Sequence, residues 1–414
     1  MNTLTIIFIA AVVLNLLVKA WLSYRQVHHV SAHRNEVPET FAAQISAEQH
    51  QKAADYTVAK SRFSVIDDLY GSLLLLGWTI GGGLAIIDSL WLKTGWSSLA
   101  TGTAVLLSMF VIGSVLELPV SFYRTFAIEQ RFGFNTMTRK LFASDFVKQS
   151  ILLLLLGTPL ALAALWLMNN MGDLWWLYVW LLWSGFSLLM LWLYPTVIAP
   201  MFNKFRPLED DAVRKHIENL LDRTGFASRG IFVMDGSRRS THGNAYFTGF
   251  GNNKRIVFFD TLLEHLSASE IEAVLAHELG HFRHKHVLKR IILIFSMSLA
   301  GLALLGWLAQ QTWFYRGLGV DQPSYHMALV LFMLAGPVFT FLLSPLFSWG
   351  SRKHEFEADR YAAQHANSDE LVSALVKLYR ENASTLTPDP VNSLFYDSHP
   401  PAAVRIAHLQ AQQT

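Results

Sequence analysis

The stretch AHELGHFRHKHVLKR, residues 276–290, runs directly into the apolar segment IILIFSMSLAGLALLGWL, residues 291–308. The first part is rich in histidine and in charged side chains, whereas the second contains none. A transmembrane helix needs about 20 mostly apolar residues, so the second part is long enough to begin a membrane span. The pair therefore predicts a polar, metal-binding helix that continues directly into the membrane.

The composition extends this prediction to the whole chain. Of 414 residues, 52 % are apolar and 15 % are charged, where roughly 25 % charged is usual for soluble domains. The apolar residues gather in seven blocks long enough to span a bilayer, near 3–23, 69–92, 98–120, 147–168, 174–198, 290–310 and 326–349. The first block lacks the basic start of a signal peptide, so we expect it to be retained as a span.

Lysine and arginine predict the orientation of these spans. The loops after the second, fourth and sixth blocks hold only Lys93 and Arg316, while the other loops and the tail carry most of the cationic residues. Cytoplasmic loops retain positive charge. We therefore expect an N-terminus outside the cell, with the long fifth loop and the C-terminus in the cytoplasm.

Charge and cysteine content exclude several classes of function. The net charge is only +2, and the chain has no lysine- or arginine-rich tract with interleaved aromatic residues, so we expect no nucleic-acid partner. The chain contains no cysteine, which excludes disulfides and thiolate metal sites. Any metal must be held by histidine, glutamate or aspartate.

The fifth loop, about 201–287, is the one stretch that resembles a soluble domain. A helix is predicted after Pro207, and three short strands are predicted in GIFVMDG, NAYFTGFG and KRIVFFD, the last two as a hairpin turning at 251–253. Ser267 with Glu270 three residues later is a capping box, which predicts that a further helix begins there.

That capped helix contains His-Glu-Leu-Gly-His at 277–281. Residues four apart share a helix face, so His277 and His281 can bind one ion. Glu278 is then placed to act as general base toward a water that the ion activates. A chance occurrence of the pattern is the alternative. His284 and His286 are expected to be solvated or to lie at the lipid headgroups.

A hydrolytic zinc site needs a third protein ligand, and HEFEAD at 354–359 is the best source. It offers His354, Glu355, Glu357 and Asp359. Glu355 and Asp359 share a helix face, so that one can bind the metal while the other orients a ligand histidine. Glu357 points away from that face and is expected to be solvated.

Motifs along most of the chain carry a resemblance to a known family. They are RNEVPETF, AADYTVAKSRF, EQRFGFN, YPTVIAPMFNKFRPLED, NAYFTGFG, HELGH, SRKHEFEAD and SHPP. In this combination the chain resembles the type I CAAX prenyl endopeptidases, which are integral membrane zinc metalloproteases. Short loops are typical of a compact bacterial member, so we expect the bacterial inner membrane as its location.

The resemblance implies a role for each matched residue. It implies one zinc ion with Glu355 as third ligand, and Asp359 hydrogen-bonded to a ligand histidine. It also implies that His399 stabilises the oxyanion, that Arg405 helps to bind or orient the substrate, and that Asn244 belongs to an edge strand that pairs with the substrate peptide. Family members enclose a chamber between their spans, where Glu117 of the third block could lie.

Together these observations predict a mainly α-helical fold: a seven-span transmembrane bundle with a gluzincin-like zinc protease domain, containing a small β-sheet, on the cytoplasmic face. The expected segments are spans one to five with their loops in 1–200, a protease module in 201–289, spans six and seven in 290–350, and the rest of the protease domain in 351–414. The expected partners are the lipid bilayer and a peptide or protein substrate, prenylated or membrane-associated.

Two alternatives remain open at this point. Within the same enzyme class, the protein could be a quality-control protease for membrane proteins that needs no prenyl group. In a different class, seven spans could belong to a transporter or receptor with a structural zinc. Structural zinc sites have four protein ligands and need no general base, so Glu278 is the residue that distinguishes the two classes.

Overall fold

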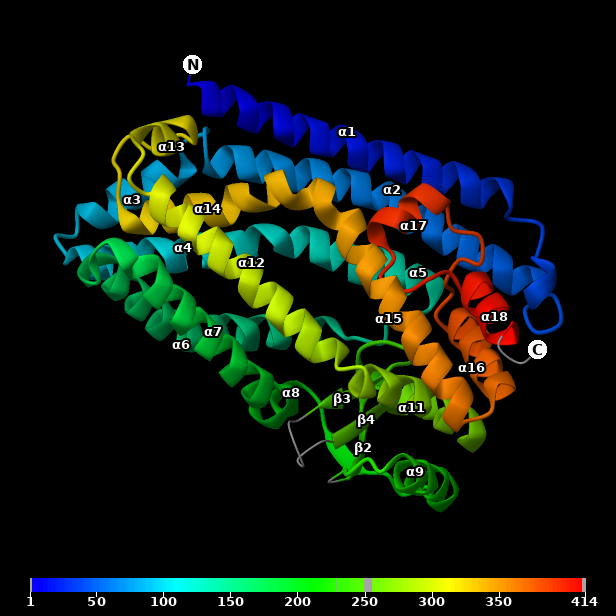
Figure 1. Cartoon of the computed structure of the whole chain (residues 1–414). Coiled ribbons are helices and arrows are strands. Elements are labelled where there is room, and N and C mark those ends of the chain that lie inside the picture. The colour runs from blue at the N-terminus through cyan, green and yellow to red at the C-terminus, as the bar shows by residue number, and fades with distance from the viewer. Residues whose placement is uncertain (1, 229, 249–254, 412–414) are drawn as a thin grey trace.

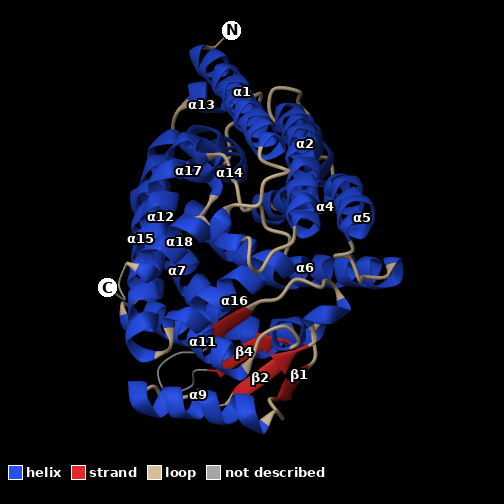
Figure 2. Ribbon diagram, turned by 90° about the vertical axis from the view of Figure 1, so that its right-hand side faces the viewer, coloured by secondary structure: helices blue, strands red, loops and turns tan. Residues whose placement is uncertain are grey.

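Long helices run side by side through most of the molecule, and a small β-sheet with its covering helices lies at one end (Figures 1 and 2). The structure is a computed structural model that describes residues 2–228, 230–248 and 255–411. The N-terminus lies at the end of the bundle away from the sheet (Figure 1). There the Asn2 side chain donates to the carbonyl of Trp313 at 2.7 Å, in the short helix α13, Thr312–Gly317.

The membrane part agrees with the predicted spans. Within the described residues, six helical segments are long and apolar enough to cross a membrane, and a bent helix pair can make a seventh. They are built from α1 Thr3–Ala32, α2 Ala47–Trp78 with α3 Gly83–Leu92, α4 Ser98–Tyr123 with α5 Gln130–Phe132, α6 Arg139–Asn170, α7 Trp175–Leu193 with α8 Ala199–Phe202, α12 His286–Leu308, and α14 Tyr325–Thr340 with α15 Ser344–His365. The multi-span fold is therefore confirmed.

The second span differs from the prediction of one continuous block. Its helix stops at Trp78, and α3 starts at Gly83 with a bend of 44°. The cause is a run of three glycines: Gly82 adopts φ +80°, a left-handed conformation that other residues rarely take. A Cβ on Gly81 would lie 2.8 Å from the Cα of Gly77, so only glycine permits this sharp break.

The sheet has four strands in the order β1-β2-β4-β3. They are β1 Phe205–Pro207, β2 Ile231–Met234, β3 Ala245–Thr248 and β4 Arg255–Phe259. The predicted pairing of the last two is confirmed as antiparallel, and the turn predicted at 251–253 lies outside the described residues. Strand β1 was not predicted. Because β3 lies at the edge of the sheet, no other strand in the described residues pairs with its outer side.

Helices cover this sheet and share one apolar core with it. They are α9 Asp211–Thr224, α10 Asp260–Leu263, α11 Ala268–Arg283, α16 Ser368–Glu381 and α18 Ala402–Gln410, while α17 Pro390–Tyr396 lies toward the spans. The core includes Ile217 and Phe258 from the long loop and Leu371 and Leu409 from the C-terminal part. Two predicted segments far apart in the sequence therefore fold around a common core.

The capping box predicted for α11 is present. The Ser267 hydroxyl accepts from the backbone N–H of Glu270, and the Glu270 carboxylate accepts from the backbone N–H of Ser267. The same carboxylate, 2 % exposed, also accepts from Lys377 at 2.7 Å. Since Lys377 belongs to α16, the cap holds the start of α11 against the C-terminal helices.

Helices α11 and α15 approach each other closely at Gly280. A Cβ built on Gly280 would lie 2.8 Å from the Cα and 3.0 Å from the carbonyl oxygen of Ala358. Both obstructing atoms belong to backbone, which cannot rotate away. The absence of a side chain at Gly280 therefore sets the spacing of these two helices.

We predict that Gly280→Ala forces α11 and α15 apart. Overpacking of this kind costs about 1–3 kcal/mol, and thermal unfolding of the detergent-purified protein should show a lower midpoint. The matched control is Gly185→Ala in α7, where a Cβ would meet nothing within 4 Å. Equal midpoints for the two variants would contradict the close approach.

Candidate active site

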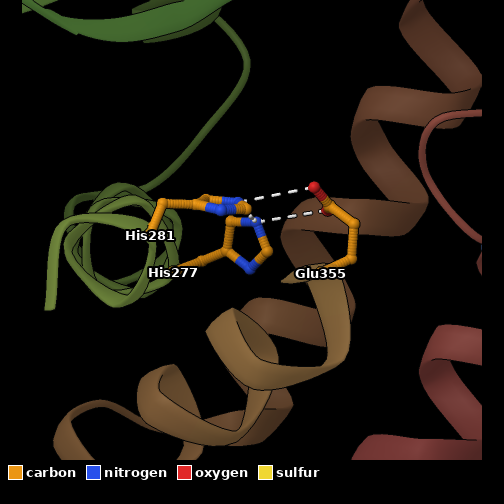
Figure 3. Close-up of side chains that lie close together, drawn as sticks. All are labelled: His277, His281 and Glu355. Atoms are coloured by element: carbon orange, nitrogen blue, oxygen red, sulfur yellow. Dashed lines mark hydrogen bonds and ion pairs between the residues drawn. The ribbon is translucent and has the colours of Figure 1, made fainter. Parts of the chain in front are cut away.

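Three side chains converge where α11 meets α15. Figure 3 shows His277 and His281 projecting from α11 toward Glu355 on α15. The Nε2 atoms of the two histidines are 3.2 Å apart. The Nε2 of His277 lies 3.5 Å from Oε2 of Glu355, and that of His281 lies 3.4 Å from Oε1. Residues 78 positions apart in sequence thus present three ligand atoms to one point.

These distances fit a bound divalent metal. Ligands at 2.0–2.1 Å in tetrahedral geometry are separated by about 3.3 Å, close to all three observed values. Glu355 is 3 % exposed, and among the described residues its Oε2 has no well-aligned hydrogen-bond donor. A buried carboxylate beside two imidazole nitrogens favours a cation at this point. The group therefore fits a metal site.

A second layer of polar residues orients His277. Its Nδ1 lies 2.8 Å from Oδ1 of Asp359, which is fully buried one turn after Glu355. A carboxylate can only accept, so Nδ1 carries the hydrogen and Nε2 presents its lone pair to the metal site. The structure thus places Asp359 beside a ligand histidine, where the resemblance implied it.

The electrostatic environment of His277 favours positive charge at this point. Burial and the nearby Arg405 guanidinium lower the pKa of His277, but hydrogen bonds to Asp359 and Glu355 outweigh them and raise it to about 9. The same two carboxylates would favour a metal cation. Because metal and proton compete for His277, acid would release the metal.

Arg405 lies behind the ligands, not on the helix surface. It is 6 % exposed, and its Nε donates to Oδ2 of Asp359 at 2.9 Å while another nitrogen donates to Oδ1. Its Nη1 lies 3.7 Å from Oε2 of Glu355. From this position the Arg405 guanidinium holds Asp359 in place and offsets the negative charge of Asp359 and Glu355. A contact of Arg405 with substrate remains a prediction.

Two further predicted residues border the metal group. Glu278 is half-buried on α11, next to His277 in sequence, and within the described chain its carboxylate has no hydrogen-bond or ion-pair partner. His399, in the loop between α17 and α18, places Nδ1 2.7 Å from Oε2 of Glu355 while its side chain is 63 % exposed. His399 therefore lies between the metal group and solvent.

Asn244 lies just before the edge strand β3. It is exposed, its carbonyl accepts from the backbone N–H of Phe259 at 2.9 Å, and its side chain accepts from the backbone N–H of Ala245 at 2.8 Å. Both contacts shape the start of β3. Pairing of that strand with a substrate stays a prediction.

Two expectations near the metal group were wrong. The metal helix does not continue directly into span six: α11 ends at Arg283, and Lys285 adopts φ +55° before α12 begins. His286 is not solvated but 5 % exposed, with Nδ1 2.9 Å from Nδ1 of His281. Glu357, 41 % exposed, accepts a hydrogen bond from His286 at 2.8 Å.

The periodicity of the sequence explains why His286 was missed. On an unbroken helix, residues five apart point about 140° away from each other, so His286 would face away from His281. The left-handed residue Lys285 removes that restriction. The only local signal was the density of histidines, which does not distinguish a buried from an exposed ring.

Comparisons with known proteins match nearly the whole chain. Residues 26–204 match the description "CAAX prenyl protease N-terminal, five membrane helices", and residues 207–413 match "Peptidase family M48". The chain belongs to peptidase family M48. It is a membrane metallopeptidase, a hydrolase with multiple transmembrane helices.

Proteins from three organisms illustrate the relationship. The chain is 33 % identical to CAAX prenyl protease 1 homolog of Arabidopsis thaliana, over 91 % of each chain. It is 33 % identical to CAAX prenyl protease 1 of Saccharomyces cerevisiae, over 94 % of this chain and 92 % of that one. The crystal structure of S. mikatae Ste24p superposes with a TM-score of 0.90 at 31 % identity, covering 99 % of both. The fold and the family are thus shared over the full length.

We predict that Glu355→Ala releases the metal. The variant loses the one carboxylate among the three converging ligands, and two histidines alone leave the site incomplete. Metal content of the purified protein, measured by mass spectrometry, should fall to a small fraction of the wild-type value. Full metal content in this variant would assign the third ligand to His354 or Glu357.

We predict that Arg405→Gln destabilises the fold itself. It leaves Asp359 buried without its cation, and breaking a buried ion pair costs about 3–5 kcal/mol. Thermal unfolding of the metal-free protein should show the loss. An unchanged midpoint with a raised KM would instead indicate that Arg405 acts only on the substrate.

Proposed function

We propose that this metallopeptidase uses one zinc ion to cleave peptide bonds near the C-terminus of membrane-attached, prenylated proteins. The observation that carries the proposal is the group of His277, His281 and Glu355 at the end of a membrane-spanning bundle. Relatives named CAAX prenyl protease support the substrate class.

The roles of the chain's own residues follow from their positions. Zinc held by the two histidines and Glu355 would act as a Lewis acid on a water and on the peptide carbonyl. Glu278 would take a proton from the attacking water and pass it to the leaving amine. His399, exposed beside Glu355, would donate to the carbonyl oxygen as negative charge develops there.

The edge strand β3 supports the binding of an extended peptide. One side of β3 pairs with β4, and no other strand of the sheet covers the opposite side. A substrate in extended conformation would add there as a further strand, with its backbone held irrespective of sequence. Asn244 would position the beginning of that edge.

An apolar cavity within the bundle supports a lipid-bearing substrate. It has a volume of about 1120 Å³ and lies between α4, α6, α7, α12 and α14. A second cavity of about 710 Å³ shares Phe110, Gln149 and Phe202 with it and is lined by Glu117, Asp145 and Arg239. A prenyl chain suits the first cavity and a peptide the second, more polar one.

We further propose that the metal site faces the cytoplasm and that the N-terminus lies outside, in a bacterial inner membrane. The support is the excess of cationic residues on the loops at the sheet end of the molecule. A prenylated protein held at the cytoplasmic surface would then reach the site directly.

The test is cleavage of a farnesylated CAAX peptide and its unprenylated twin by detergent-purified protein. Wild-type protein should cleave the farnesylated peptide faster, and a chelator should abolish cleavage. Glu278→Gln should keep the zinc and lose activity by about 10²–10⁴-fold, because it removes the general base.

Glu264→Gln serves as the matched control, since Glu264 is an exposed carboxylate ahead of α11. It should cleave like wild type. Equal cleavage of both peptides would favour a quality-control protease without a prenyl requirement. Cleavage by zinc-loaded Glu278→Gln at the wild-type rate would refute the mechanism.

A further inference from the structure

A chain of polar side chains leads away from His281 on the side opposite the metal. The Nδ1 of His281 lies 2.9 Å from Nδ1 of His286, and Nε2 of His286 lies 2.8 Å from Oε2 of Glu357. The ring of His286 is stacked on that of His354, with centroids 4.0 Å apart and planes 12° from parallel. His286 is thus held both at its edges and on its face.

The hydrogen-bonding roles along this chain follow from its outer end. A carboxylate only accepts, so Nε2 of His286 carries a hydrogen and donates to Glu357. In the neutral ring Nδ1 is then an acceptor, and the Nδ1–H of His281 donates to it. Nε2 of His281 is left with a free lone pair. The hydrogen bonds from His281 through His286 to Glu357 therefore select the tautomer of His281 that can bind a metal.

The backbone between the two histidines shows that the contact is imposed by the fold. Lys285 has φ +55° and ψ +35°, a left-handed conformation that is unfavourable for a residue other than glycine. This conformation ends α11 and starts α12 at His286, turning that ring toward His281. Backbone strain of this kind persists where surrounding contacts hold it.

The two ligand histidines are therefore oriented through different elements. His277 is held by Asp359 and Arg405, while His281 is held by His286, the first residue of the membrane helix α12, and by Glu357. Loss of an outer hydrogen-bond partner of a metal ligand usually weakens metal affinity by about 10–100-fold.

We propose that His286, anchored by Glu357, is a positioning residue that fixes the ring and tautomer of His281 and so ties the metal site to span α12. The inference rests on the proposed zinc site and adds to it a residue pair outside the ligand set. His286 would not contact the metal or the substrate.

The test measures the affinity of the metal-free, full-length protein for Zn²⁺ by competition with a chromophoric chelator. Asn at 286 places its carbonyl oxygen where His286 has Nδ1, so His286→Asn can still accept from His281. Gln places its polar group where His286 has Nε2, so His286→Gln keeps a donor for Glu357 but loses the acceptor. We expect His286→Gln and His286→Ala to bind zinc about 10–100-fold more weakly, and His286→Asn to stay near wild type.

Two further variants complete the series. Glu357→Ala removes the carboxylate that accepts a hydrogen bond from His286, and it should also weaken zinc binding. This variant keeps the proposal testable if substitutions at 286 prevent folding. The matched control His28→Ala removes an exposed ring in α1, whose ring neighbour is Tyr24 and not His286, and it should bind zinc like wild type. Thermal unfolding of each metal-free variant shows whether weaker zinc binding comes from a destabilised fold or from a misplaced His281 ring.

The inference is overturned if His286→Asn and His286→Gln bind zinc equally, or if Glu357→Ala binds like wild type. Failure of the proposed function is a different result: wild-type protein with no zinc affinity would refute the metal site itself. Zinc affinity that depends on residue 286 in a protein inactive on every CAAX peptide would support the inference and refute only the substrate class.

Discussion

The close approach of α11 and α15 is the constraint on which the site depends. With no side chain at Gly280, the backbone at Ala358 can lie against α11, and Glu355 comes within 3.5 Å of both ligand histidines. Without a metal, hydrogen bonds from protonated His277 to Asp359 and Glu355 can hold these groups together, and a bound metal cation would replace the proton on Nε2. Helix packing places the three candidate ligands, and a bound metal would stabilise their arrangement further.

The membrane bundle and the small sheet contribute different properties to this site. The spans hold the ends of α12 and α15 and enclose an apolar cavity, where a lipid chain can leave water. The sheet offers an unpaired edge at β3, where a peptide backbone can bind irrespective of its side chains. In the proposed function, one substrate would use both the cavity and the strand edge.

Long, strongly patterned elements could be predicted from the sequence, and irregular backbone could not. Apolar blocks identified all seven spans, because a helix in lipid must be apolar over its whole length. The break at Gly82, the left-handed Lys285 and the strand β1 escaped prediction. Apolar periodicity reveals neither a left-handed residue nor the pairing of strands distant in sequence, such as that of β1 with β2.

The sequence by itself determined the candidate ligand types, their spacing on one helix face, and the carboxylate beside them, since four-residue spacing places His277 and His281 together on any α-helix. Only the tertiary structure decided which carboxylate of HEFEAD faces them, and that Arg405 is buried behind Asp359. It alone shows that Nδ1 of His286 lies 2.9 Å from Nδ1 of His281. The physical reason is that local spacing sets directions on a single helix, whereas contacts between helices depend on how closely and at what angle they pack.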